Sequence, residues 1–158
     1  MKLEFNNLAN FELDLKYHGW GMPLTVDVLV NCMHMYYGAI TEDKKIEGSF
    51  FFDRDTPFRL EINLRDKTYA HTDLDKNLDH CIEIVKLKFM DYDLLPLMHE
   101  NVYYAHQDCE QPNPGDMVVT HGSKVMGQNG TLMLGSIKEP FFTWYHKITH
   151  QGVLYELT

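Results

Sequence analysis

The chain has 158 residues, the size of one ordinary domain, so we expect a single domain over residues 1–158. Its formal charge of -9 disfavours nucleic acid as a partner, because phosphate groups would be repelled. No apolar run has the length of a membrane span, and the polar start "MKLEFNNLANFELDL" lacks the apolar core of a secretory signal. We therefore expect a protein that is made in the cytoplasm and is not inserted into a membrane.

Apolar and polar residues alternate through most of the chain, as in strands that bury one face and expose the other. The clearest case is "FELDLKY", in which Phe11, Leu13 and Leu15 alternate with charged residues. The hydrophobic share of 44% and the aromatic share of 13% agree with a strand-rich globular domain. We predict strands at 11–17, 24–30, 33–40, 45–53, 57–64 and 81–94, with further strands between 115 and 158.

The segments between these strands carry recognisable turn signals. Asn31 and Cys32 join two predicted strands through a tight turn or a bulge. A change of parity within the longest strand predicts a bulge near Val85. Within residues 115–137, Gly122, Gly127 and Gly130 lie between two apolar runs and predict a hairpin with positive backbone φ angles, so we interpret that segment as a turn rather than a site.

Many short alternating strands without a long helical pattern predict an antiparallel β-sandwich, jelly-roll-like, of about nine strands. A small closed barrel is the alternative. Residues 139–152 begin near Pro140 and end at Gly152, and they form either a short C-terminal helix or the first arm of a terminal hairpin. Roughly thirty inward apolar side chains would stabilise such a core, so we expect no cofactor.

Catalytic motifs are weak in this sequence. The closest is "HQD", because an HxD pair with a distal histidine forms the ligand set of non-haem iron oxygenases on jelly-roll scaffolds. Here the pair is His106 and Asp108, and the distal ligand would be His146 or His150. With nine histidines one such pair is expected by chance, so a metal-dependent jelly-roll enzyme is our alternative function and a non-catalytic protein the main one.

Two other groups of residues have plain structural interpretations. Cys32, Cys81 and Cys109 lack the CxxC spacing of zinc or redox sites, and we predict buried free thiols. The segment "DLDKNLD", residues 73–79, has acids at alternate positions like a calcium loop, but the glycine and the closing glutamate are missing. We interpret it as a solvated acidic loop.

Several aromatic residues do not fit the inward pattern of the strands. Flat rings flanked by amides and carboxylates are typical of shallow glycan sites, and the same residue types are enriched at protein interfaces. Aromatic side chains are also core material, so burial in the core stays open as the third interpretation. The candidate binding residues are Trp20, Tyr37, Tyr103, Tyr104, Trp144 and Tyr145.

The order of four segments resembles the small jelly-roll modules of tailed bacteriophages and the related carbohydrate-binding modules. These segments are "YHGWGMPLTVDVLVN", "PFRLEINLRDK", "IEIVKLKFMDYDL" and "PFFTWYHKI". The resemblance covers most of the chain as a pattern and matches no ligand residue. It implies a non-catalytic, oligomeric component of a virion or tail, which contacts other virion proteins or a host glycan.

Overall fold

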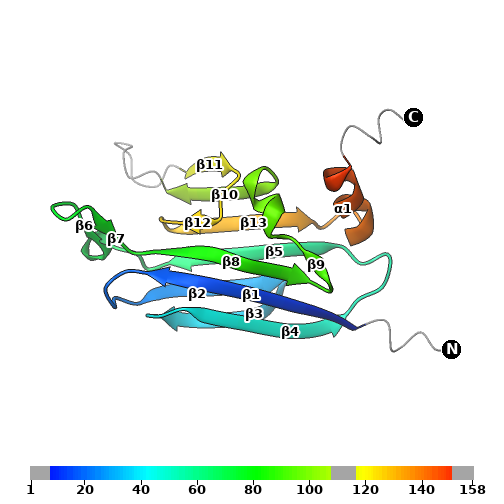
Figure 1. Cartoon of the computed structure of the whole chain (residues 1–158), viewed down its shortest axis with the longest axis horizontal. Coiled ribbons are helices and arrows are strands. Elements are labelled where there is room, and N and C mark those ends of the chain that lie inside the picture. The colour runs from blue at the N-terminus through cyan, green and yellow to red at the C-terminus, as the bar shows by residue number, and fades with distance from the viewer. Residues whose placement is uncertain (1–7, 108–116, 151–158) are drawn as a thin grey trace.

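The computed structural model describes residues 8–107 and 117–150, which form two antiparallel β-sheets packed face to face (Figure 1). The predicted fold class, an antiparallel β-sandwich with one short helix, is confirmed. The described residues form 13 strands rather than about nine. The excess arises because four of the strands have only two residues each, which is too short to show alternation.

The chain crosses repeatedly from one sheet to the other, so strands that follow each other in sequence often belong to different sheets. The first sheet has the order β12-β8-β1-β4, with β9 paired to β8. Its strands are β1 (Leu8–His18), β4 (Lys44–Phe51), β8 (Cys81–Phe89), β9 (Tyr92–Asp93) and β12 (Val125–Met126). The second sheet has the order β11-β10-β13-β5-β2-β3. Its strands are β2 (Leu24–Val30), β3 (Met33–Ile40), β5 (Phe58–Arg65), β10 (Val102–Gln107), β11 (Met117–His121) and β13 (Gly130–Ser136).

Short elements complete the two ends of the sandwich. A hairpin of β6 (Thr72–Asp73) and β7 (Leu78–Asp79) projects at one end, preceded by the 3-10 turn η2 (Tyr69–His71). The helix α1 (Phe141–Thr149) lies at the opposite end (Figure 1). A second 3-10 turn, η3 (Leu95–His99), leads into β10. Within the part of the chain that the structure describes, no helix is long and apolar enough to cross a membrane.

The core follows from the two-residue period of the strands. In β1, Phe11 and Leu13 are fully buried, and in β5, Leu60 and Ile62 are fully buried, while the residues between them face outward. Each such side chain contributes about 1.5–3 kcal/mol when it leaves water. The hydrophobic effect therefore fixes which face of every long strand meets the other sheet.

The bulge predicted near Val85 is confirmed. Asp14 of β1 pairs with Lys86, and the next residue of β1 pairs with Ile84, so Val85 is the extra residue on β8. Its side chain is 42% exposed, and the bulge returns the following apolar residues to the core face.

Asn31 and Cys32 form a tight two-residue turn between β2 and β3, with φ angles of 51° and 66°. The Asn31 side chain secures the turn, since its amide donates to the carbonyl of Pro57 and its oxygen accepts from the N–H of Arg59, both at 2.8 Å. The prediction that Cys32 is buried is wrong, because the turn places it on the surface. Cys81 is half-buried, and Cys109 lies outside the described residues.

The two ends of segment 115–137 do not pair with each other, as a hairpin would require. Both β11 and β13 pair with β10, which lies between them, and β12 crosses to the other sheet. Gly122 does have a positive φ of 81°, and a Cβ there would lie 1.8 Å from the carbonyl oxygen of His99. The glycine therefore permits a close backbone contact in addition to a turn.

Of the two alternatives for residues 139–152, the structure forms the helix. Pro140 precedes the first helical residue, where its missing N–H costs nothing. Phe141 is fully buried and contacts the rings of Phe89 and Tyr92, so α1 covers this end of the core. Aromatic packing that the sequence pattern could not reveal decides between helix and strand here.

Candidate functional site

An open pocket of about 520 Å³ lies between the β1–β2 connection and the β6–β7 hairpin. One wall is the indole of Trp20, which is 46% exposed. The rest of the lining belongs to η2 and the hairpin, and it consists of Ala70, Thr72, Asp73, Leu74 and Asp75. A large exposed aromatic ring and two acidic residues thus line one space large enough for a small molecule.

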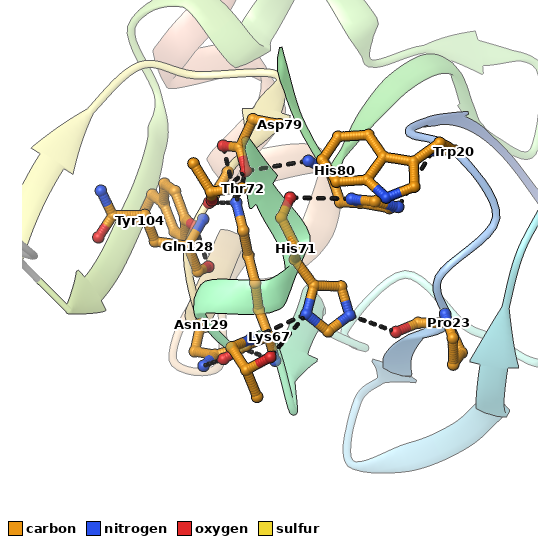
Figure 2. A network of polar contacts seen from close by, with 12 residues as sticks. Trp20, Pro23, Lys67, His71, Thr72, Asp79, His80, Tyr104, Gln128 and Asn129 are labelled. Carbon is orange, nitrogen blue, oxygen red and sulfur yellow. Dashed lines mark hydrogen bonds and ion pairs between the residues drawn. The ribbon is translucent and has the colours of Figure 1, made fainter. Parts of the chain in front are cut away.

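The imidazole of His80 holds Trp20 in place from below, as Figure 2 shows. Its Nε2 accepts hydrogen bonds from the backbone N–H groups of Trp20 at 3.1 Å and Met22 at 3.2 Å. Its Nδ1 lies 2.8 Å from the carbonyl oxygen of His71, which can only accept, so Nδ1 carries the proton. The indole and imidazole centroids are 3.9 Å apart with the rings at 65°. His80 is fully buried, so the wall of the pocket rests on a rigid support.

His71 fixes the base of the hairpin in the same manner. Its Nδ1 accepts from the backbone N–H of Thr68 at 2.9 Å, and its Nε2 donates to the carbonyl of Pro23, also at 2.9 Å. The ring meets His80 edge to face at 5.2 Å. Two buried imidazoles therefore tie the β1–β2 connection to the hairpin, and their ring nitrogens are all used within the protein (Figure 2).

Lys67 joins the hairpin to the connection between β12 and β13. Its ammonium forms an ion pair with Asp79 at 2.8 Å and donates to the carbonyl of Gly127. The side chain of Asn129 bonds both the N–H and the carbonyl of Lys67 at 2.9 Å (Figure 2). Asp79 also accepts from the Thr72 hydroxyl at 2.7 Å and from the N–H of His80 at 2.9 Å. Segment 115–137 thus supports the pocket without lining it.

Asp73 and Asp75 remain as the acidic groups of the pocket. Asp73 accepts from the backbone N–H of Lys76 at 3.2 Å, which closes the turn of the hairpin. Asp75 is exposed. The interpretation of residues 73–79 as a solvated loop is therefore incomplete, because two of its acidic residues line the same pocket as Trp20.

The six aromatic residues singled out in the sequence are not brought together. Tyr37 and Tyr103 are exposed on the outer face of the second sheet, but β13, β5 and β2 lie between their strands. At about 4.8 Å for each strand step, the two residues are about 19 Å apart across the sheet. Trp20 lines the pocket at the end of the sandwich, so no common surface includes all three.

Tyr104, Trp144 and Tyr145 pack against the core and do not belong to the pocket lining. Tyr104 is 4% exposed, and its hydroxyl bonds the backbone of Gln128. Desolvation by burial raises the pKa of Tyr104 to about 12. Trp144 and Tyr145 are half-buried, and both contact the ring of Phe141 under α1.

The metal alternative finds no support in the described residues. His106 pairs with Gly130 at the start of β13, whereas His146 and His150 belong to the helical region that follows the end of that strand. The six steps along β13 separate these ends by about 20 Å. Asp108 lies outside the described residues. Within the described ranges, no three His, Cys, Asp or Glu side chains form a group that could hold a metal ion.

Sequence reasoning missed the supporting histidines, although a signal was present. His71 and His80 bracket the acidic segment, and Trp20 lies between Gly19 and Gly21. A Cβ on Gly19 would lie 2.2 Å from Cδ2 of His80, so the glycine is required by the ring packed against it. Only the tertiary structure shows that these features, about sixty residues apart, meet.

Comparison with known proteins supports the fold. No protein-family model matches the chain, and no curated protein matches it. Two solved structures are similar, both of a protein called vCBM60. The selenomethionine form of vCBM60 gives a TM-score of 0.53 at 9% identity, over 82% of this chain and 92% of that one. Its description concerns circular permutation as an evolutionary link between two families of calcium-dependent carbohydrate binding modules. The complex of vCBM60 with galactobiose gives 0.47 at 8% identity, over 80% and 97%.

The fold is similar to that of a carbohydrate-binding module. Calcium belongs to the description of that neighbour, and a calcium site here would need oxygen ligands from the pocket. Asp79 is already bonded to Lys67, Thr72 and the backbone N–H of His80, so Asp73 and Asp75 are the acidic residues that line the pocket. Ca²⁺ takes six to eight oxygen ligands. The described residues of the pocket do not fit a calcium site.

Proposed function

We propose that this protein is a non-catalytic carbohydrate-binding module whose ligand binds in the pocket beside Trp20. The observation that carries the proposal is the exposed indole, held by buried His80, in an open pocket that Asp73 and Asp75 also line. The similarity of the fold to vCBM60 supports it. No step of the proposal depends on Tyr104, Trp144 or Tyr145.

The chemistry of the pocket suits a sugar ring. One face of a pyranose presents C–H groups, which pack on the flat indole of Trp20. The hydroxyl groups at the ring edge donate hydrogen bonds, and the carboxylates of Asp73 and Asp75 accept them in the stronger, charge-assisted form. The volume of about 520 Å³ lies within the range of small-ligand pockets, and its open side would let a longer chain continue beyond the site.

A glycan array followed by calorimetry on the hits tests the proposal. Trp20 and Trp144 are the only tryptophans, so a Trp144→Phe background makes the fluorescence of Trp20 a direct reporter of the pocket. We expect binding to change that fluorescence. Trp20→Ala should weaken binding about fivefold to thirtyfold, because stacking of one ring contributes about 1–2 kcal/mol.

Tyr37→Ala is the matched control, since Tyr37 is 65% exposed and lies on the outer sheet face away from the pocket. It should leave affinity unchanged. Equal losses in the two variants, or no glycan bound at all, would contradict the proposal. Release of shorter sugars from a bound oligosaccharide would contradict the non-catalytic part, because the same two carboxylates would then act as acid and base.

The virion or tail role implied by the sequence resemblance belongs to the same proposal. A shallow pocket with one aromatic wall gives weak binding, and many copies in one assembly would raise avidity without new contacts. Exposed Tyr103 lies on the outer sheet face, where a neighbouring copy or another virion protein could pack. Light scattering after size exclusion tests this: an oligomer is expected, and a strict monomer up to high concentration would contradict it.

A further inference from the structure

We infer that the pocket selects glycans by charge: it binds neutral and amino sugars, rejects uronate, sialate and sulfate groups, and makes its contacts without a metal. The inference rests on the proposed function, which it deepens by naming the ligand class. The hydrogen-bonding groups of the lining residues determine which ligands fit. Asp73 and Asp75 contribute carboxylates, which only accept hydrogen bonds.

The third polar side chain of the lining does not change this balance. The hydroxyl of Thr72 donates to Asp79 at 2.7 Å, so its proton points away from a ligand. The other lining side chains are two apolar groups and the indole of Trp20, whose N–H is the one side-chain donor the lining adds. Most hydrogen-bond donors must therefore come from the ligand, as hydroxyl or ammonium groups.

The nearest buried cation is already used. Lys67 has a side chain only 10% exposed, and its ammonium is held by Asp79 and the carbonyl of Gly127. Lys76 follows Asp75 in the chain but does not belong to the lining. No hydrogen bond or ion pair joins Asp75 to any residue that the structure describes. The pocket thus presents negative charge without a lining cation that could pair with an acidic sugar.

The size of the effect follows from Coulomb's law. A ligand charge about 5 Å from each carboxylate, at an effective dielectric of about 50 to 80 because both groups reach solvent, changes affinity about tenfold to a hundredfold. The sign is repulsive for an acidic sugar and attractive for an amino sugar. Because both carboxylates are partly exposed, salt screens the effect, and the discrimination should shrink several-fold between low salt and 0.5 M.

A direct contact between carboxylate and sugar also predicts that a chelator changes nothing. A calcium ion bridging the two carboxylates would reverse the selection, because its charge would attract acidic sugars. Only two acidic side chains line the pocket, and the third acid of the hairpin, Asp79, is bonded elsewhere. Charge selectivity and insensitivity to chelators are therefore linked outcomes of the same geometry.

The test compares pairs of sugars with the same ring and linkage that differ at one charged substituent. The probes are neutral cello-hexaose against the β-1,4-glucosamine hexamer, and α-1,4-galactobiose against α-1,4-digalacturonate, measured by calorimetry at 20 mM and 500 mM salt, with and without EDTA. We expect a preference of at least tenfold for the neutral member over the acidic one and for the amino sugar over the neutral one. The preference should shrink at high salt and survive EDTA.

Isosteric variants locate the effect. Asp73→Asn with Asp75→Asn should remove most of the charge preference and leave the melting temperature and the Trp20 emission unchanged. Asp91→Asn is the control, because Asp91 is an exposed acid at the β8–β9 turn, outside the pocket lining, and it should keep the full preference. Equal or tighter binding of the acidic sugars, or loss of binding in EDTA that calcium restores, would overturn the inference. Failure of every sugar, on the probes and on the array, would instead overturn the proposed function.

Discussion

Replacing His80 by alanine is the most informative perturbation of this structure, because one fully buried ring supports both the fold and the pocket. The change would leave the N–H groups of Trp20 and Met22 without their partner, while the carbonyl of His71 would keep only the backbone N–H of residue 80. Each unpaired group costs about 1 kcal/mol or more, and the cavity left by the ring adds to this. We expect a loss of about 3–5 kcal/mol, a large fraction of the 5–15 kcal/mol that stabilises a typical domain.

Urea unfolding followed by circular dichroism measures this loss, and the emission of Trp20 in a Trp144→Phe background reports the pocket. The control is His99→Ala, since His99 is exposed at the end of η3, and this variant should change stability by less than 0.5 kcal/mol. In His80→Ala the emission of Trp20 should shift to the red, because the indole loses its support. A stability loss below about 1 kcal/mol, with unchanged emission, would refute the role assigned to this ring.

Two further substitutions test the burial of a phenol and the close approach of two backbones. Because the pKa of Tyr104 is raised from 10.0 to about 12, the folded protein holds the phenol proton more tightly than the unfolded chain does. The stabilisation that results is fully present below pH 10 and is lost as the pH rises through 12. Wild type should lose about 2–3 kcal/mol over that range relative to Tyr104→Phe in urea titrations, and parallel curves would contradict this. Gly122→Ala should lower the free energy of unfolding by at least about 2 kcal/mol, because the φ of Gly122 is positive and a Cβ there would meet the carbonyl of His99. Gly127 has open space around it, so Gly127→Ala should be nearly neutral when both variants are measured by thermal unfolding.

The strand pattern alone predicted the sandwich because burial of one face imposes a period of two on each strand. The same rule located the bulge at Val85, where the parity of the apolar residues changes. It failed for segment 115–137, since alternation says which face of a strand is buried and nothing about its partner. There β10 lies between the two strands, and Met126 crosses to the other sheet as part of the core.

Aromatic residues show the limit of sequence reasoning at the site. Tyr103 and Tyr104 are neighbours in the chain, yet Tyr103 is 50% exposed and Tyr104 is buried, because successive strand residues point to opposite faces. The pattern could not say which of the two faces inward. For Trp20 the difficulty is different, since its exposure depends on a connection held by a residue 60 positions away.

By itself the sequence determined the class of fold, the faces of its long strands and the acidic character of the chain, since these follow from local period and composition. The tertiary structure alone decided which strands are neighbours and which aromatic residues reach solvent. It also decided that Asp73 and Asp75 line the pocket with Trp20 while Asp79 is bonded elsewhere. The physical reason is that strand pairing and buried polar contacts join residues distant in the chain, and the hydrogen bonds of His71, His80 and Lys67 exist only once those segments meet.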